Sequence, residues 1–158
     1  NRCSRCDQSG VGFEMSDNSI QQLLDIEAIK QLKARYFRCM DTKDWAGFQR
    51  VFASNARMIV PEGGVDLAGN KTIADTISGF LQGATTTHHG HMPEIQITGT
   101  NTATGIWAMF DYVQFPGADG QSGMGLQGYG HYHEEYVRED GEWKIARLEL
   151  SRLRVDPV

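Results

Sequence analysis

The hydrophobic pattern of this 158-residue chain changes once, near Gly83, from a helical repeat to a strand-like one. Before Gly83, apolar residues recur every three or four positions, which is typical of amphipathic helices. After it, four segments are rich in β-branched and aromatic residues: 88–98, 102–115, 126–138 and 143–154. Because the helices precede the strands and do not alternate with them, the sequence predicts an α+β fold whose second half is an antiparallel meander. The Gly-rich loop 116–125 is expected to be a mobile tip, with a lid over a pocket as the alternative.

Three helices are predicted in the first half. Ser19 has capping-box spacing to Gln22, and Lys30, Lys33 and Arg35 lie between the apolar positions of the first helix. Those apolar positions are Ile26, Ile29, Leu32, Tyr36 and Met40. We therefore expect a long amphipathic helix whose polar face includes the three basic residues.

Two shorter helices follow. Asp44 can cap the second, and Asn70 can cap the third. Their apolar faces are formed by Trp45, Phe48, Val51 and Phe52, and by Ile73, Ala74, Ile77, Phe80 and Leu81. Between them we expect a strand at 56–60 and a return strand at 65–68, on either side of a Gly-Gly turn.

Composition excludes several classes of protein. The net charge is -5 and the pI is about 5.5, and Lys and Arg form no basic cluster, so an electrostatic footprint for nucleic acid is missing. No apolar run approaches the roughly 18 residues typical of a membrane span. We expect a cytoplasmic protein with no nucleic-acid or membrane partner.

Residues 1–14 differ from the rest of the chain. They are polar and hold Cys3 and Cys6, which make half of a zinc-ribbon signature at best, and they contain no apolar core of a signal peptide. We expect a leader, an upstream read-through or an expression remnant here, and a single domain over 15–158. Cys39 lies within a helical pattern and is predicted to be a buried small hydrophobe.

All five histidines fall in two predicted strands. Alternation places His89 and His91 on one face and His88 on the other, while His131 and His133 share a face of their own strand. The two His-x-His pairs could hold a metal ion, or could be surface-facing or core histidines. A single histidine acting as general base needs only an acidic partner and access to a pocket, so we favour that interpretation and predict no metal site.

Two carboxylates occupy unusual positions. Asp41 ends the first helix, where the helix dipole disfavours an anion by about 0.3 to 1 kcal/mol and should raise its pKa. It is either a turn residue or an inward carboxylate that orients an imidazole. Asp111 is the lone acid on an apolar face, so it must be paired or have a raised pKa. A salt bridge to Arg147 or Arg152 and a role in catalysis or substrate positioning both stay open.

Alternation also assigns the faces of the last strands. Trp107, Met109 and Asp111 share a face with Val113 and Phe115. In the last strand, Arg152 and Arg154 are placed on the face opposite Arg147, and Arg152 is expected to reach the mouth of a pocket. We predict that Asp111, Arg152, Trp107 and Met109 contact the substrate.

Several stretches together resemble the SnoaL-like branch of the NTF2-like superfamily, which has the cystatin-like fold. They are Ile26 to Asp41 with Asp44, Trp45 and Phe48, then His88 to Ile95, Asn101 to Gly105 with Trp107, and Tyr136 to Trp143 with its Asp-Gly turn. The similarity covers about 19–155 and is strongest to bile acid 7α-dehydratases, with scytalone dehydratases and hexachlorocyclohexane dehydrochlorinases further off. The loop 116–125 and the strand after it, which carries Gly128, Gly130, His131 and His133, depart from the steroid enzymes, so the resemblance does not fix the pocket size or the substrate.

The resemblance implies a fold, an assembly and a set of site residues. The fold is a cone of strongly curved antiparallel sheet backed by three N-terminal helices around an apolar pocket, with no cofactor, in a homo-oligomer for which a trimer is favoured over a dimer. The family's catalytic Tyr, Asp and His match Tyr36, Asp41 and His88, and its second Asp and last-strand Arg match Asp111 and Arg152.

The resemblance also implies a mechanism. Asp41 would fix the tautomer of His88, which would remove a proton next to an activated carbon, while Tyr36 would donate a hydrogen bond to a carbonyl. His88 or the surroundings of Asp111 would protonate the departing hydroxyl. We therefore expect a cofactor-independent, dehydratase-like lyase or isomerase acting on a small hydrophobic cyclic substrate such as a steroid or an aromatic polyketide. The alternatives are a non-catalytic ligand-binding module and the small subunit of a ring-hydroxylating dioxygenase.

Overall fold

The computed structural model describes residues 17–118 and 121–158. Its helices are α1 (Asp17–Asp41), α2 (Trp45–Arg50), the 3-10 turn η1 (Pro61–Gly63) and α3 (Asn70–Phe80). Its strands are β1 (Phe52–Val60), β2 (Val65–Ala68), β3 (Thr85–Gly99), β4 (Thr102–Pro116), β5 (Ser122–Glu139) and β6 (Glu142–Pro157). The expectations for residues 1–14, including Cys3 and Cys6, lie outside the described residues.

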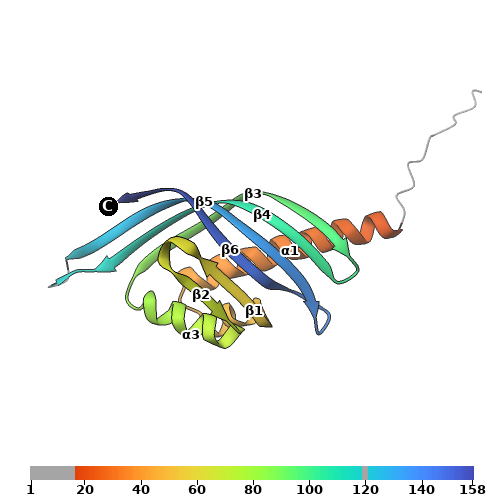
Figure 1. Ribbon diagram of the computed structural model, residues 1–158, viewed down its shortest axis with the longest axis horizontal. Coiled ribbons are helices and arrows are strands. Elements are labelled where there is room, and N and C mark those ends of the chain that lie inside the picture. Colours follow the sequence, from red (N-terminus) through yellow and green to blue (C-terminus); the bar gives the residue numbers. More distant parts are fainter. Residues whose placement is uncertain (1–16, 119–120) are drawn as a thin grey trace, which may run out of the picture.

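The strands form one sheet in the order β2-β1-β6-β5-β4-β3. Neighbouring strands are antiparallel except β1 and β6, which run parallel. The hairpin of β1 and β2 thus joins the predicted meander of β3 to β6 at the edge formed by β6. Figure 1 shows β3 to β6 curving over α1, with β1, β2 and α3 gathered on one side. The prediction of an α+β fold with three N-terminal helices and a curved, mainly antiparallel sheet is confirmed.

Helix α1 differs from its prediction at two places. It begins at Asp17, so Ser19 lies inside the helix and is not its cap. Lys33, expected on the polar face, is completely buried in the same stripe as Ile29 and Tyr36. The position follows from helical spacing, because Lys33 lies four residues after Ile29 and three before Tyr36.

The C-terminal end of α1 is a Schellman motif. The N–H of Lys43 donates to the Met40 carbonyl and the N–H of Asp44 donates to the Cys39 carbonyl, at 3.3 and 2.8 Å. Lys43 occupies the left-handed position of this motif with a φ of 62°. The motif turns the chain sharply and ends α1 at Asp41. Cys39 is buried here, as predicted.

The second helix is shorter than predicted, and the third has a different cap from the one predicted. Asp44 caps α2 as expected, since its Oδ1 accepts from the Gly47 N–H at 2.8 Å. Phe52, predicted at the end of this helix, instead begins β1. Gly69, with a φ of 88°, is the cap of α3, so Asn70 is its first helical residue and makes no side-chain cap. The positive φ suits glycine and would strain another residue.

The four predicted strand segments correspond to β3 to β6, and all are longer than predicted. The loop expected at 116–125 is correspondingly shorter, because β4 continues to Pro116 and β5 begins at Ser122. The Asp-Gly turn is confirmed as a two-residue hairpin in which Asp140 and Gly141 have φ of 53° and 81°.

The last strand departs from strict alternation. Register shifts interrupt the β5–β6 pairing, one of them between Tyr129 and Gly130. Arg154 therefore pairs with Tyr129 and its guanidinium lies over that ring, 5.9 Å from its centroid. The prediction that Arg154 shares a face with Arg152 is wrong, because the irregularity adds a residue to one strand and reverses the faces beyond it.

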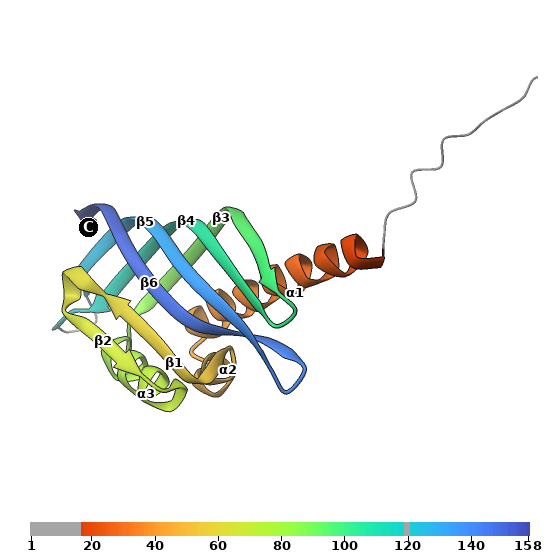
Figure 2. The same cartoon turned by 45° about the vertical axis from the view of Figure 1, so that its right-hand side comes forward.

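The two faces of the sheet have different surroundings. We call the face that packs on the helices the inner face; it carries most of the buried core, including Trp107, Tyr132 and Leu148. Figure 2 shows that α1, α2 and α3 all lie on this side of the curved strands. Among the described residues, no helix is both long and apolar enough to cross a membrane.

Candidate active site

A cavity of about 400 Å³ lies between the inner face and the helices. Its walls are mainly aliphatic and aromatic side chains from α1, β1, α3, β4 and β6. The polar groups on its walls include Tyr36, Glu62, His88, Asp111, Tyr132 and Arg152. An apolar chamber with a few polar groups is the usual character of a small-molecule site.

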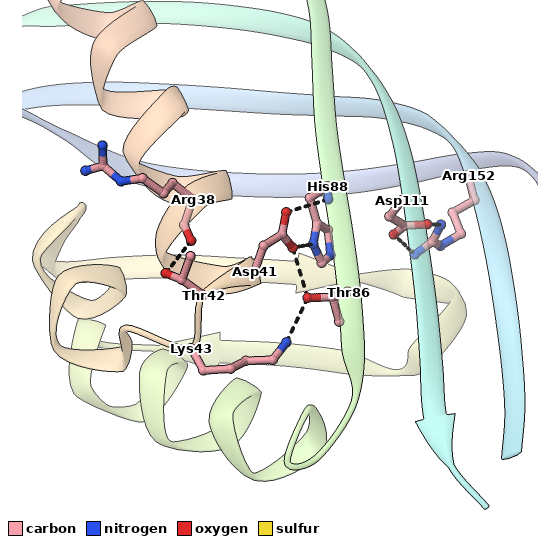
Figure 3. A network of polar contacts seen from close by, with 8 residues as sticks. All are labelled: Arg38, Asp41, Thr42, Lys43, Thr86, His88, Asp111 and Arg152. Atoms are coloured by element: carbon pink, nitrogen blue, oxygen red, sulfur yellow. Dashed lines mark hydrogen bonds and ion pairs between the residues drawn. The ribbon is translucent and has the colours of Figure 1, made fainter. Parts of the chain in front are cut away.

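Asp41 and His88 meet at the wall of this cavity. The His88 Nδ1 lies 2.6 Å from Asp41 Oδ1, and the His88 backbone N–H donates to Asp41 Oδ2 at 2.8 Å. The His88 side chain is 7% exposed and the Asp41 side chain is 23% exposed. The end of α1 and strand β3 therefore bring together the two residues that the sequence predicts as a pair, as Figure 3 shows.

The hydrogen bonds at Asp41 determine its charge. Burial opposes ionisation of this carboxyl, but the hydrogen bonds from the ring and backbone of His88 and from the Thr86 hydroxyl outweigh it and lower its pKa. The expected upward shift from the helix dipole is thus wrong, because these local donors dominate. An ionised Asp41 only accepts hydrogen bonds, so His88 Nδ1 must carry a proton, and in the neutral ring Nε2 is then the nitrogen with the lone pair.

Tyr36 lines the same cavity as His88. Burial, together with Tyr132 and the negative charge of Glu134, raises the pKa of Tyr36 well above its usual value. Burial likewise raises the pKa of Tyr132. Both hydroxyls therefore stay protonated over the physiological range and can donate hydrogen bonds at the cavity wall.

Asp111 forms a salt bridge with Arg152, which is one of the two partners that the sequence leaves open. The guanidinium donates to both carboxylate oxygens, at 2.9 and 2.7 Å. Arg147 instead pairs with Glu149. Burial disfavours the charge on Arg152, but its hydrogen bonds to Asp111 raise its pKa. The cavity thus holds a bidentate ion pair whose charges cancel.

The ion pair passes over Gly128 of β5. Asp111 is the register partner of Gly128, and a methyl group added at Gly128 would lie 1.7 Å from Arg152 Nη1 and 2.2 Å from Asp111 Oδ1. We expect Gly128→Ala to displace the guanidinium and to reduce the free energy of unfolding by up to about 3 kcal/mol, since Asp111 is left poorly paired. Urea denaturation measures this loss.

Gly79→Ala is the matched control for this prediction. Gly79 lies in α3 with open space around its position, so an added methyl should stabilise the helix by about 0.5 to 1 kcal/mol. A Gly128→Ala protein as stable as the wild type would contradict this role of Gly128, which is to leave space for the Asp111–Arg152 ion pair.

Trp107 and Met109 are placed differently from the other predicted site residues. Both are buried on the inner face, but neither is among the described residues that line the cavity. The Trp107 indole N–H donates to the Tyr136 hydroxyl at 2.8 Å. These two side chains belong to the packing behind the cavity, and their contact with a substrate stays a prediction.

The remaining histidines lie on the outer face of the sheet. His89 and His91 are exposed with ring centroids 6.0 Å apart, and those of His131 and His133 are 6.3 Å apart. Strand β4 lies between the two pairs. In the described residues, no group of three or more His, Cys, Asp or Glu side chains could hold a metal ion.

Sequence reasoning missed several polar residues around the site, including Glu62 and Tyr132 on the cavity wall. Thr86 and Lys43 extend the contacts of Asp41, and Lys33 forms a buried ion pair with Glu134 behind Tyr36. Helical spacing could have revealed Lys33, since it lies in the stripe of Tyr36. Alternation could have revealed Thr86, which shares the face of His88 on β3, but Lys43 has no such signal because only the Schellman turn brings it there.

Solved structures share this fold at low identity. A protein assigned as a scytalone dehydratase from Novosphingobium aromaticivorans is 18% identical, with a TM-score of 0.77 over 87% of this chain and 90% of that one. A type 2 hexachlorocyclohexane dehydrochlorinase is 19% identical, with a TM-score of 0.77 over 88% and 92%. A protein assigned as an aromatic ring hydroxylase from Novosphingobium aromaticivorans is 21% identical, with a TM-score of 0.74 over 86% and 94%. Identities this low establish the fold alone.

The family comparison covers most of the chain. The model of the SnoaL-like domain matches residues 21–149. That range contains Tyr36, Asp41, His88 and Asp111, and it ends shortly before Arg152. The opening helices, the whole curved sheet up to β6 and the Asp-His pair therefore fall within one family match. The chain belongs to the SnoaL-like domain family, within the NTF2-like superfamily.

Proposed function

We propose that this protein is a cofactor-independent lyase or isomerase of the dehydratase type, acting on a small hydrophobic cyclic substrate. The observation that carries the proposal is the hydrogen-bonded pair of Asp41 and His88 at the wall of an apolar cavity. The SnoaL-like family match and the similarity to proteins described as dehydratase and dehydrochlorinase are consistent with it. The homo-oligomer, with a trimer favoured, stays a prediction from the resemblance.

Proton transfer begins at His88 in this proposal. The free Nε2 lone pair removes a proton from the carbon next to a substrate carbonyl, and ionised Asp41 stabilises the imidazolium that forms. Tyr36 donates a hydrogen bond to the carbonyl oxygen as that oxygen gains negative charge. The imidazolium then returns the proton to a hydroxyl leaving from the β-carbon, so the products are an alkene and water. Return of the proton to another carbon would give an isomerase.

The cavity suits an uncharged substrate. Asp111 and Arg152 neutralise each other, and the other polar wall groups are two phenols, the imidazole, the Thr76 hydroxyl and the Glu62 carboxylate. A substrate carboxylate would thus find no unpaired cation among the described wall residues and would lose its hydration. Steroids and aromatic polyketides with a hydroxyl β to a ketone combine the required apolar body with the reacting groups.

Deuterium exchange tests the proposal even while the substrate is unidentified. The purified protein is incubated in D2O with a panel of neutral cyclic β-hydroxyketones, and mass spectrometry follows both deuterium uptake and loss of water. We expect uptake or dehydration of at least one compound with the wild type. Compounds that bind equally to the wild type and to His88→Ala, with neither reaction, would favour a binding module instead.

A further inference from the structure

The Asp-His pair is the inner part of a longer hydrogen-bonded chain. The Lys43 ammonium donates to the Thr86 hydroxyl at 2.7 Å, and that hydroxyl lies 2.9 Å from Asp41 Oδ1. Figure 3 shows the four side chains in sequence, from Lys43 on the turn after α1 to His88 on β3. This series of hydrogen bonds connects the cavity wall with Lys43, a half-buried lysine that the proposed mechanism does not use.

The donors in this chain can point only one way. An ammonium group has three hydrogens and no acceptor, so the Thr86 oxygen must accept from Lys43. The single hydroxyl hydrogen of Thr86 is then free to donate to Asp41, which accepts it alongside the ring and backbone N–H groups of His88. Lys43 thereby fixes the Thr86 oxygen as its acceptor and leaves the Thr86 hydrogen for Asp41.

The backbone at Lys43 gives a second, independent observation. Lys43 occupies the left-handed position of the Schellman motif, where glycine is preferred because a Cβ is strained there. Strained residues at such positions concentrate at functional sites. The long side chain, which glycine lacks, is what reaches Thr86 from this position.

We propose that Lys43 and Thr86 are positioning residues that set the pH range in which His88 acts as a base. This inference rests on the proposed function for its consequence in catalysis, but the effect on the imidazole is a property of the folded protein. Lys43 and the Thr86 hydroxyl withdraw negative charge from Asp41. They weaken its hold on the imidazolium, so His88 stays unprotonated at lower pH.

Other charged and titratable groups face His88 across the cavity. They are Tyr36 from α1, Glu62 from η1, Asp111 from β4, Tyr132 from β5 and Arg152 from β6. The two phenols are neutral, Asp111 and Arg152 cancel each other, and the Glu62 carboxylate accepts the backbone N–H of Arg152 at 3.1 Å. Asp41 is thus the charge in direct contact with the ring, and Lys43 is the cation connected to it.

The test compares pH profiles of kcat/KM for Lys43→Met, Thr86→Val and Thr86→Ser. Loss of the cation or of the hydroxyl should stabilise the imidazolium and move the acid limb to higher pH. A half-exposed charge two groups away from the ring shifts titration by on the order of half a pH unit. That shift makes kcat/KM about threefold lower at pH values below the limb. Thr86→Ser keeps the hydroxyl and should match the wild type.

Two variants separate this effect from general changes of charge or packing. Lys71→Met removes a positive charge from an exposed ion pair on α3, and Thr42→Val removes a hydroxyl that donates to the Arg38 carbonyl at the same end of α1. Neither should move the acid limb. Lys43→Gly should shift the limb as Lys43→Met does, and should raise Tm because glycine relieves the left-handed strain.

NMR titration of the His88 ring gives a readout that needs no substrate. We expect its midpoint to move to higher pH in Lys43→Met and Thr86→Val and to stay in place in Thr86→Ser. An unmoved midpoint in both of the first two variants would overturn the proposal. If the midpoint moves while the wild type catalyses neither exchange nor dehydration, the positioning role stands and the proposed function fails.

Discussion

Replacing His88 with alanine is expected to abolish turnover while leaving the fold intact. His88 is the group placed to remove the substrate proton, and loss of a general base typically costs about 10² to 10⁴-fold in rate. The measurement is kcat/KM on the compound identified by deuterium exchange, with circular dichroism as the check on folding. His89→Ala is the matched control, because His89 is the exposed neighbour on the outer face.

Asp41→Asn is expected to give a comparable loss, up to about 10⁴-fold, through a different cause. The amide can donate a hydrogen bond to Nδ1 and so favour the tautomer in which Nε2 carries the proton. Because the pKa of Asp41 is lowered in the folded protein, the wild-type acid limb should reflect protonation of His88 and not of Asp41. Full activity in either variant would remove the proposed mechanism.

Removing one partner of the Lys33–Glu134 pair is expected to cost about 3 to 5 kcal/mol of unfolding free energy. Both side chains are fully buried, and Glu134 also accepts the Tyr136 hydroxyl. The ammonium lies 4.0 and 3.7 Å from the ring centroids of Tyr36 and Tyr132, so it supports two walls of the cavity from behind. Such a loss is a large part of the stability of an ordinary domain.

A double-mutant cycle tests this expectation. Lys33→Met and Glu134→Gln should each be strongly destabilising in guanidinium denaturation, because each leaves a buried group without its partner. The double variant should recover much of the loss, since no unpaired charge is then buried. Strictly additive losses would mean that the two side chains do not stabilise each other.

The same pair makes a prediction for pH dependence. Burial lowers the pKa of Lys33 to about 8, against the opposing attraction of Glu134. Between about pH 8 and its ordinary value the folded protein loses this proton while the unfolded chain keeps it. Stability from this group should therefore rise with pH in that window, and the Lys33→Met/Glu134→Gln variant should lack the rise.

Local sequence signals predicted elements well where one residue determines the local geometry. Asp44 caps α2, and the Asp140-Gly141 turn closes the last hairpin, because both depend on a few adjacent backbone groups. The start of α1 and the cap of α3 were misplaced, since Ser19 and Asn70 are common both at caps and inside helices. Arg154 was assigned to the wrong face because a register irregularity leaves no mark in the pattern of residue types.

The candidate site was only partly predictable. The resemblance identifies Tyr36, Asp41 and His88; in the structure Tyr36 and His88 line one cavity, and Asp41 is hydrogen-bonded to His88. Trp107 and Met109 share the face of Asp111 but lie in the packing behind the cavity wall, a distinction that alternation cannot make.

Residue patterns alone predict the order of helices and strands, the alternation along β4 and the residue types available for proton transfer. These depend on contacts within a few residues, which hydrophobic period and turn chemistry report. The folded protein was needed to see that Arg152 pairs with Asp111 over Gly128, and that Lys43 reaches Asp41 through Thr86. Those contacts join segments 41 to 45 residues apart, and their geometry depends on strand register, sheet curvature and one left-handed turn.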